Sequence, residues 1–200
     1  MSPLLDSIGS VKGFGFGLST LGGPAYDSIA TVTLGSAQST ISFTSIPSTY
    51  KHLQIRYIAR SSQPQTFANF IVATFNSDTT IGNYYSRHRL NGRGDGTIYS
   101  DLSAGSFRSQ VGFVAGGSTT SNNFSPGIID ILDYTSTSKN KTIRVLSGLA
   151  GQGTSTDNDV AFISSLYFPS TISAISTIDL NVPGWNFAQH SSFALYGIRG

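Results

Sequence analysis

Lys51-His-Leu-Gln-Ile-Arg-Tyr-Ile-Ala-Arg60 has the clearest alternation of apolar and polar side chains in the chain. Successive side chains of a β-strand point to opposite faces, so the alternation separates this stretch into two sets. The apolar set is Leu53, Ile55, Tyr57 and Ala59. The polar set is His52, Gln54, Arg56 and Arg60. This pattern is typical of a strand whose sheet packs on a core with one face and meets solvent with the other, so we predict that the apolar set is buried.

Ten further stretches read as short strands, and clusters of glycine, proline and asparagine separate many of them. They are Ile29–Leu34, Thr40–Ile46, Asn69–Phe75, Asn83–Leu90, Ser106–Val114, Ile128–Tyr134, Thr142–Ala150, Val160–Phe168, Ile175–Val182 and Phe193–Ile198. No helical periodicity lies between them. Short strands at this spacing predict an all-β fold, an antiparallel and jelly-roll-like β-sandwich that occupies residues 27–200.

The composition favours the same fold class. The 200 residues suit one domain, 11% of them are charged, and none is glutamate, a strong helix former. Serine and threonine are abundant, which disfavours helix interiors. With 38% hydrophobic residues, including 13 Phe and 9 Tyr, the chain has enough apolar surface to form a core, which excludes a disordered protein.

Charge and cysteine content exclude several function classes. A formal net charge of +2 with scattered basic residues indicates neither nucleic-acid binding nor attraction to a membrane surface. The chain has no cysteine, so it can form neither disulfides nor thiolate metal sites. No apolar run is long enough to insert into a membrane, and the first residues do not have the pattern of a secretory signal.

Residues 1–26 differ from the rest because glycine alternates with large apolar residues. Such a segment cannot build a core of its own, since glycine has no side chain to pack. One interpretation is a frayed terminus or linker. The other is an extended anchoring arm that docks on a neighbouring protein by strand addition, with Phe14, Phe16 and Leu18 as its anchors.

Sequence motifs for catalysis or metal binding are weak. The histidines at 52, 88 and 190 have no metal-binding spacing, and the loop from Asp157 to Asp159 is only a weak candidate for Ca²⁺. Asp130 and Asp133 are three residues apart, so on one strand they point to opposite faces. We expect a salt bridge or a cap near a turn from them rather than a catalytic pair. The sequence thus predicts no enzyme and no cofactor.

Three blocks resemble the small virion structural proteins of tailed bacteriophages. They are Ile41–Arg56, Asn83–Leu90 and Ser192–Ile198, and they consist of packing and turn residues. The resemblance implies a non-enzymatic virion component, either a tail fibre or tail-tip module or a capsid decoration protein. It also implies a homotrimer that contacts other virion proteins through the arm, with a host-surface glycan as a further partner.

The alternative is a carbohydrate-binding or carbohydrate-cleaving β-sandwich. The only tryptophan, Trp185 in Pro183-Gly-Trp-Asn186, is the candidate platform on which a sugar ring would stack. The competing interpretation is that Trp185 closes one end of the core. Cleavage would also need two carboxylates close together in a cleft.

Overall fold

A computed structural model describes residues 25–64, 69–93, 96–103, 109–149, 159–167 and 169–200. In these residues the regular structure is β-strand, apart from one 3-10 turn at Ile81–Asn83. All strand pairs within the two sheets are antiparallel. The predicted all-β class with antiparallel sheets is confirmed. Of the predicted arm, residues 1–26, the first 24 lie outside the described residues, and Tyr26 already belongs to strand β1.

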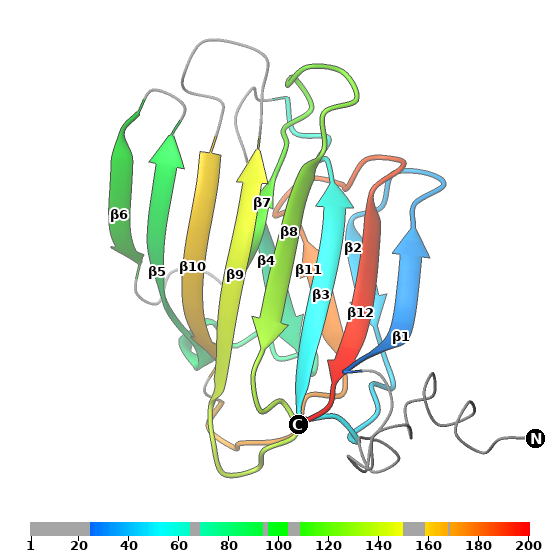
Figure 1. The fold of residues 1–200 in the computed structure, drawn as a ribbon, viewed down its shortest axis with the longest axis vertical. Helices are drawn as coiled ribbons and strands as arrows, with labels where there is room; N and C mark the ends of the chain where they lie inside the picture. The colour runs from blue at the N-terminus through cyan, green and yellow to red at the C-terminus, as the bar shows by residue number, and fades with distance from the viewer. Residues whose placement is uncertain (1–24, 65–68, 94–95, 104–108, 150–158, 168) are drawn as a thin grey trace, which may run out of the picture.

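The strands form two sheets that face each other (Figure 1). The eight-stranded sheet has, in spatial order, β1 (Tyr26–Thr33), β12 (Ser192–Ile198), β3 (His52–Ala59), β8 (Ser125–Ile131), β9 (Lys141–Leu149), β10 (Asp159–Tyr167), β5 (Tyr84–Arg93) and β6 (Ile98–Ser103). The four-stranded sheet has β2 (Thr40–Phe43), β11 (Ile178–Asn181), β4 (Asn69–Phe75) and β7 (Ser109–Val114). In Figure 1 the smaller sheet lies behind the larger one.

The predicted strands are found, with one strand missed. Strand β6 is an edge strand, and its described side chains at 98–100 show no buried face, since Ile98 is 72% and Tyr99 43% exposed. The largest boundary error is in β8, which ends at Ile131. Asp133 therefore lies in the following turn, with a positive φ of 47°. Aspartate tolerates this left-handed conformation better than most residues.

The predicted orientation of β3 is confirmed. The apolar set lies in the core, with exposed fractions of 0, 0, 3 and 0% for Leu53, Ile55, Tyr57 and Ala59. The polar set was predicted to meet solvent, and for Gln54 this is wrong, because it is only 7% exposed. Its amide nitrogen donates to Asp130 Oδ1 (2.8 Å) and its amide oxygen accepts from Arg56 Nε (2.7 Å), so both polar atoms of the side chain are paired with neighbours on the outer face.

Arg60, the last member of the polar set, supports the loop between β7 and β8. Its guanidinium donates to four backbone carbonyls at 2.7–3.0 Å, those of Gly117, Thr119, Thr120 and Asn123. The fixed fork of five N–H donors makes arginine suited to several acceptors at once. This arginine is therefore part of the scaffold.

The centre of the core is organised around Tyr57. Its hydroxyl donates to the carbonyl of Phe113 on β7 at 2.8 Å, and its ring stacks on Phe193, 6.0 Å away. Burial raises the pKa of the Tyr57 hydroxyl well above its usual value, so the group stays protonated and can donate this bond. The side chain thus links the two sheets.

Candidate functional site

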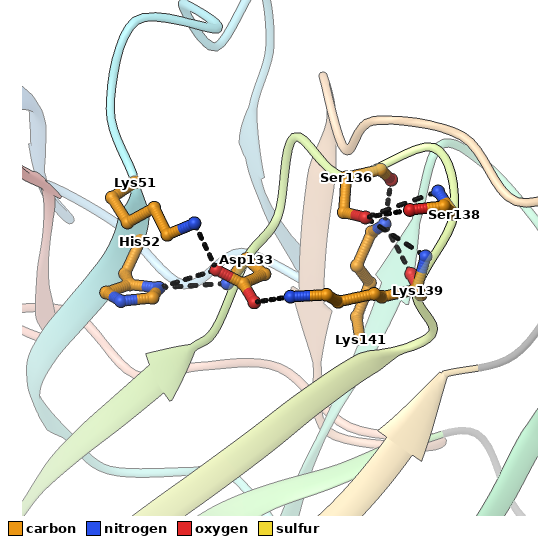
Figure 2. A network of polar contacts seen from close by, with 7 residues as sticks. All are labelled: Lys51, His52, Asp133, Ser136, Ser138, Lys139 and Lys141. Atoms are coloured by element: carbon orange, nitrogen blue, oxygen red, sulfur yellow. Dashed lines mark hydrogen bonds and ion pairs between the residues drawn. The ribbon is translucent and has the colours of Figure 1, made fainter. Parts of the chain in front are cut away.

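The densest cluster of charged side chains lies at the turn between β8 and β9, where Asp133 is the central carboxylate (Figure 2). Lys51 contacts Asp133 Oδ1 at 3.0 Å, and Lys139 contacts Oδ2 at 3.2 Å. These two ammonium groups lower the pKa of Asp133 below its usual value. Lys51 precedes β3 and Lys139 precedes β9, so the carboxylate ties the start of β3 to this turn.

His52 belongs to the same cluster but forms no ion pair in this arrangement. The backbone N–H of Asp133 donates to His52 Nδ1 at 2.9 Å, so Nδ1 must be the unprotonated nitrogen. The contact of 3.7 Å between Nδ1 and Asp133 Oδ1 is then not an ionic one. The imidazole acts as an acceptor for the turn.

Lys141 is the buried member of the cluster, with 1% of its surface exposed. Its ammonium donates to the backbone carbonyls of Ser136 and Lys139, as Figure 2 shows. Burial lowers its pKa, although Asp133 partly offsets the effect. Because its partners are main-chain carbonyls of the turn, this lysine fixes the shape of the turn.

The arrangement around Asp133 is that of a structural clasp. General acid–base chemistry on a glycoside needs two carboxylates, and the second candidate, Asp130, instead pairs with Arg144 at 3.3 Å on the outer face of the sheet. The expectation that these two aspartates form salt bridges is confirmed. Within the described ranges no three His or Asp side chains converge in a way that could hold a metal ion.

Asp133→Asn is expected to destabilise the protein at neutral pH and to have much less effect in acid. A carboxylate whose folded pKa lies below its unfolded value of about 3.9 stabilises the fold above that value. This contribution disappears as the pH falls through the folded pKa. Urea unfolding of both proteins at pH 7 and pH 2.5 should show the difference shrink, and an equal difference at both values would contradict the role of the charge.

A second polar cluster surrounds Asp78. Its carboxylate accepts from the Thr80 backbone N–H (2.9 Å), the Asn83 amide (2.7 Å) and the Tyr167 hydroxyl (3.1 Å). Burial alone would raise the pKa of Asp78, but the hydrogen bonds together outweigh it and lower the pKa. Because these partners are backbone, amide and phenol groups, the cluster holds the β4–β5 connection and offers no acid–base pair.

The third feature is a shallow hollow on the outer face of the eight-stranded sheet, which we call the Arg56 hollow. It has a volume of about 170 Å³, and its lining includes Thr31, Arg56, Ile58, Ser192 and Ala194 from strands β1, β3 and β12. The hollow forms because β12 carries small side chains here, those of Ser192 and Ala194.

Two tyrosines that do not line the hollow lie beside its arginine. The Arg56 guanidinium carbon lies 5.2 Å from the centroid of the Tyr26 ring and 5.1 Å from that of Tyr196. Both distances are within the range of cation–π attraction. In the part of the chain that the structure describes, Arg56 forms no ion pair.

The fourth feature is a row of exposed aliphatic side chains across the same outer face, which we call the aliphatic row. It comprises Ile128, Leu146, Leu90 and Ile98, which are 37, 43, 50 and 72% exposed. Ile128 is the cross-strand partner of Leu146, and position 162 of β10 pairs with both Leu146 and Leu90. Ile98 on β6 lies opposite Gly92, one step further along the same face.

Of the site residues that the sequence suggested, the structure describes Trp185 but not the anchors of the arm. Phe14, Phe16, Leu18 and the loop residue Asp157 lie outside the described residues. Trp185 lies in the turn between β11 and β12 and is 39% exposed. Its ring stacks on no other aromatic ring of the described residues. Sequence reasoning missed both the Arg56 hollow and the aliphatic row.

The chain was compared with protein-family models and with curated proteins. No protein-family model matches it, and no curated protein matches it. None of the described segments is a helix long and apolar enough to cross a membrane.

Proposed function

We propose that this chain is a non-enzymatic structural module of a bacteriophage virion, a tail fibre or tail-tip component or a capsid decoration protein. The aliphatic row is the observation that carries the proposal. Large aliphatic side chains that are exposed together on one face are costly on a free protein and mark a contact with another molecule. The described members of the row lie on β8, β9, β5 and β6, which suits an assembled particle in which a neighbour covers them.

The strand order supports a jelly-roll-like sandwich. In a jelly roll of eight strands, the first pairs with the eighth, the eighth with the third and the third with the sixth. The smaller sheet, β2-β11-β4-β7, has this order if β2 is counted as the first strand, β4 as the third, β7 as the sixth and β11 as the eighth. In this count, β8, β9 and β10 together take the place of the seventh strand. Strands β1 and β12 then extend the larger sheet at one edge. Such sandwiches serve as virion modules without catalytic residues.

The edge strands support the anchoring arm and the homotrimer. The two sheets end at β1, β6, β2 and β7, and none of these strands contains a lysine or arginine. Charged residues on edges are a common defence against unwanted strand pairing. Asp27 and Asp101 are the only charged residues on these four strands, so the edges suit strand addition by the arm of residues 1–26. The aliphatic row reaches the edge strand β6 at Ile98, so it would lie in the contact between identical copies in a closed ring.

Deleting residues 2–23 is expected to leave a folded domain that is no longer incorporated into particles. Phe14 and Phe16 would each contribute about 1.5–3 kcal/mol when buried in a partner. The number of copies per purified particle, measured by quantitative mass spectrometry, tests the loss. Circular dichroism of the truncated protein confirms the fold.

Two substitution variants sharpen this test. Phe14→Ser with Phe16→Ser should reproduce the loss in a chain of full length. Leu4→Ser with Leu5→Ser removes two apolar residues from the same segment and should retain incorporation. Full occupancy of particles by the truncated protein would overturn the anchoring role.

The second candidate function is carbohydrate binding, which the Arg56 hollow favours. It combines hydroxyls, apolar side chains and an arginine on an exposed sheet face, and two tyrosine rings lie beside that arginine. In a virion module it would provide the contact with a host-surface glycan. Carbohydrate cleavage gains no such support, because Asp130 and Asp133 serve separate salt bridges.

A further inference from the structure

We propose that the Arg56 hollow binds a single sugar ring that carries a carboxylate, as in a uronic or sialic acid. This inference rests on carbohydrate binding as the second candidate function and names its ligand class. It does not depend on where the protein resides in a particle. Three properties of the hollow support the proposal. They are the availability of the Arg56 guanidinium, the fixed orientation of this group, and the chemistry of the other side chains that line the hollow.

The cation is available to a ligand. Arg56 Nε donates to Gln54 Oε1 at 2.7 Å, but the two terminal nitrogens have no partner among the described residues. Asp130, the carboxylate on the neighbouring strand, is already bound by the Gln54 amide (2.8 Å) and by Arg144 (3.3 Å). The local charge at the hollow is therefore positive, which complements an anionic ligand.

The guanidinium is also held in one orientation. Gln54 fixes its Nε edge, and the rings of Tyr26 and Tyr196 lie 5.2 and 5.1 Å away. An arginine held in this way loses less conformational entropy when it binds than a free one. Its planar pair of terminal N–H groups matches the two oxygens of a carboxylate.

The rest of the hollow suits a sugar ring. Thr31 and Ser192 supply hydroxyls that bond to no other described residue, while Ala194 and Ile58 supply apolar surface. A pyranose has the same mixture of hydroxyl edges and apolar C–H faces. The volume of about 170 Å³ is below the roughly 300–1,000 Å³ of pockets for drug-sized ligands, so one ring fits better than a chain of rings.

The test compares two ligands that differ only in the carboxylate. Methyl β-D-glucuronide and methyl β-D-glucoside are titrated into the full chain, and binding is followed by chemical-shift changes in NMR spectra. We expect saturable binding of the glucuronide and at least tenfold weaker binding of the glucoside. Acetate serves as the carboxylate without a ring and should bind at least tenfold more weakly than the glucuronide.

Three variants locate the site. Arg56→Gln should weaken glucuronide binding at least tenfold, and Ala194→Val should do the same by filling the floor without changing charge. Lys139→Gln removes one positive charge from the exposed turn between β8 and β9, outside the hollow, and should leave binding within twofold. Arg56 and Ala194 lie on the outer face of the sheet and Lys139 lies in a turn, so the variants should remain folded.

The outcomes separate the two levels of the proposal. Equal binding of glucoside and glucuronide would overturn the acidic ligand while leaving carbohydrate binding intact. Equal binding of acetate and glucuronide would overturn the sugar. If neither sugar binds at 10 mM, or if Arg56→Gln and Lys139→Gln weaken binding equally, both the ligand class and this site are wrong.

Discussion

Gly127→Ala is expected to destabilise the sandwich by about 1–3 kcal/mol, the usual cost of overfilling a packed core. A Cβ atom at Gly127 would lie 2.2 Å from Tyr57 Cζ and 2.3 Å from its hydroxyl oxygen. The ring cannot move away freely, because it stacks on Phe193 and its hydroxyl is bound to the Phe113 carbonyl. Urea unfolding at pH 7 measures the loss as a lower midpoint at unchanged slope.

The matched control is Gly92→Ala in β5, where an added Cβ would meet no atom within 4 Å. Its expected effect is within about 0.5 kcal/mol. A Tyr57→Leu background provides the second control, since Gly127→Ala should cost much less once the ring is gone. If Gly127→Ala costs no more than Gly92→Ala, then Tyr57 does not restrict this position.

The features of the fold that could be predicted are those that depend on neighbours in the sequence. Alternation at positions 51–60 predicts the buried face of β3 because burial there follows the two-residue period of the backbone. The expectation of salt bridges at Asp130 and Asp133 is also met, but its premise is wrong, because Asp133 lies in the turn after β8 and not on the strand. The buried face of β3 could be predicted without knowing which strands are adjacent.

The features that could not be predicted depend on pairing between distant strands. Arg56 meets Tyr26 and Tyr196 only because β12 lies beside β3 and β1 lies beside β12. Gln54 has Tyr196 of β12 and Asp130 of β8 as its cross-strand neighbours, and neither pairing can be read from the local sequence. A partial signal for the aliphatic row was present. Ile128 is followed by Ile129, and Leu146 follows Val145, so each stands beside another large apolar residue in its strand. Because neighbouring side chains of a strand point to opposite faces, one residue of each pair must lie on the outer face.

The last prediction concerns self-association through the aliphatic row. We expect the protein at micromolar concentration to scatter light as a species of three times the 21.2 kDa chain mass. Ile128→Asp with Leu146→Asp should reduce this to the mass of a single chain. An unpaired carboxylate buried in a contact costs several kcal/mol, and this variant would place two in each copy.

The substituted side chains are exposed in the single chain, so their replacement tests the contact between copies and not the packing of the core. Ile128 and Leu146 are 37 and 43% exposed, so aspartate at both positions leaves the core unchanged and the domain folded. Ile81→Asp is the matched control and should leave the trimer intact, because Ile81 is 50% exposed on the 3-10 turn, away from the row.

Salt gives a second test of the contact. About 1 M NaCl, where the screening length is roughly 3 Å, should not dissociate an apolar contact. A wild-type protein with the mass of one chain would show that the row contacts a different molecule, and that the particle itself arranges the copies.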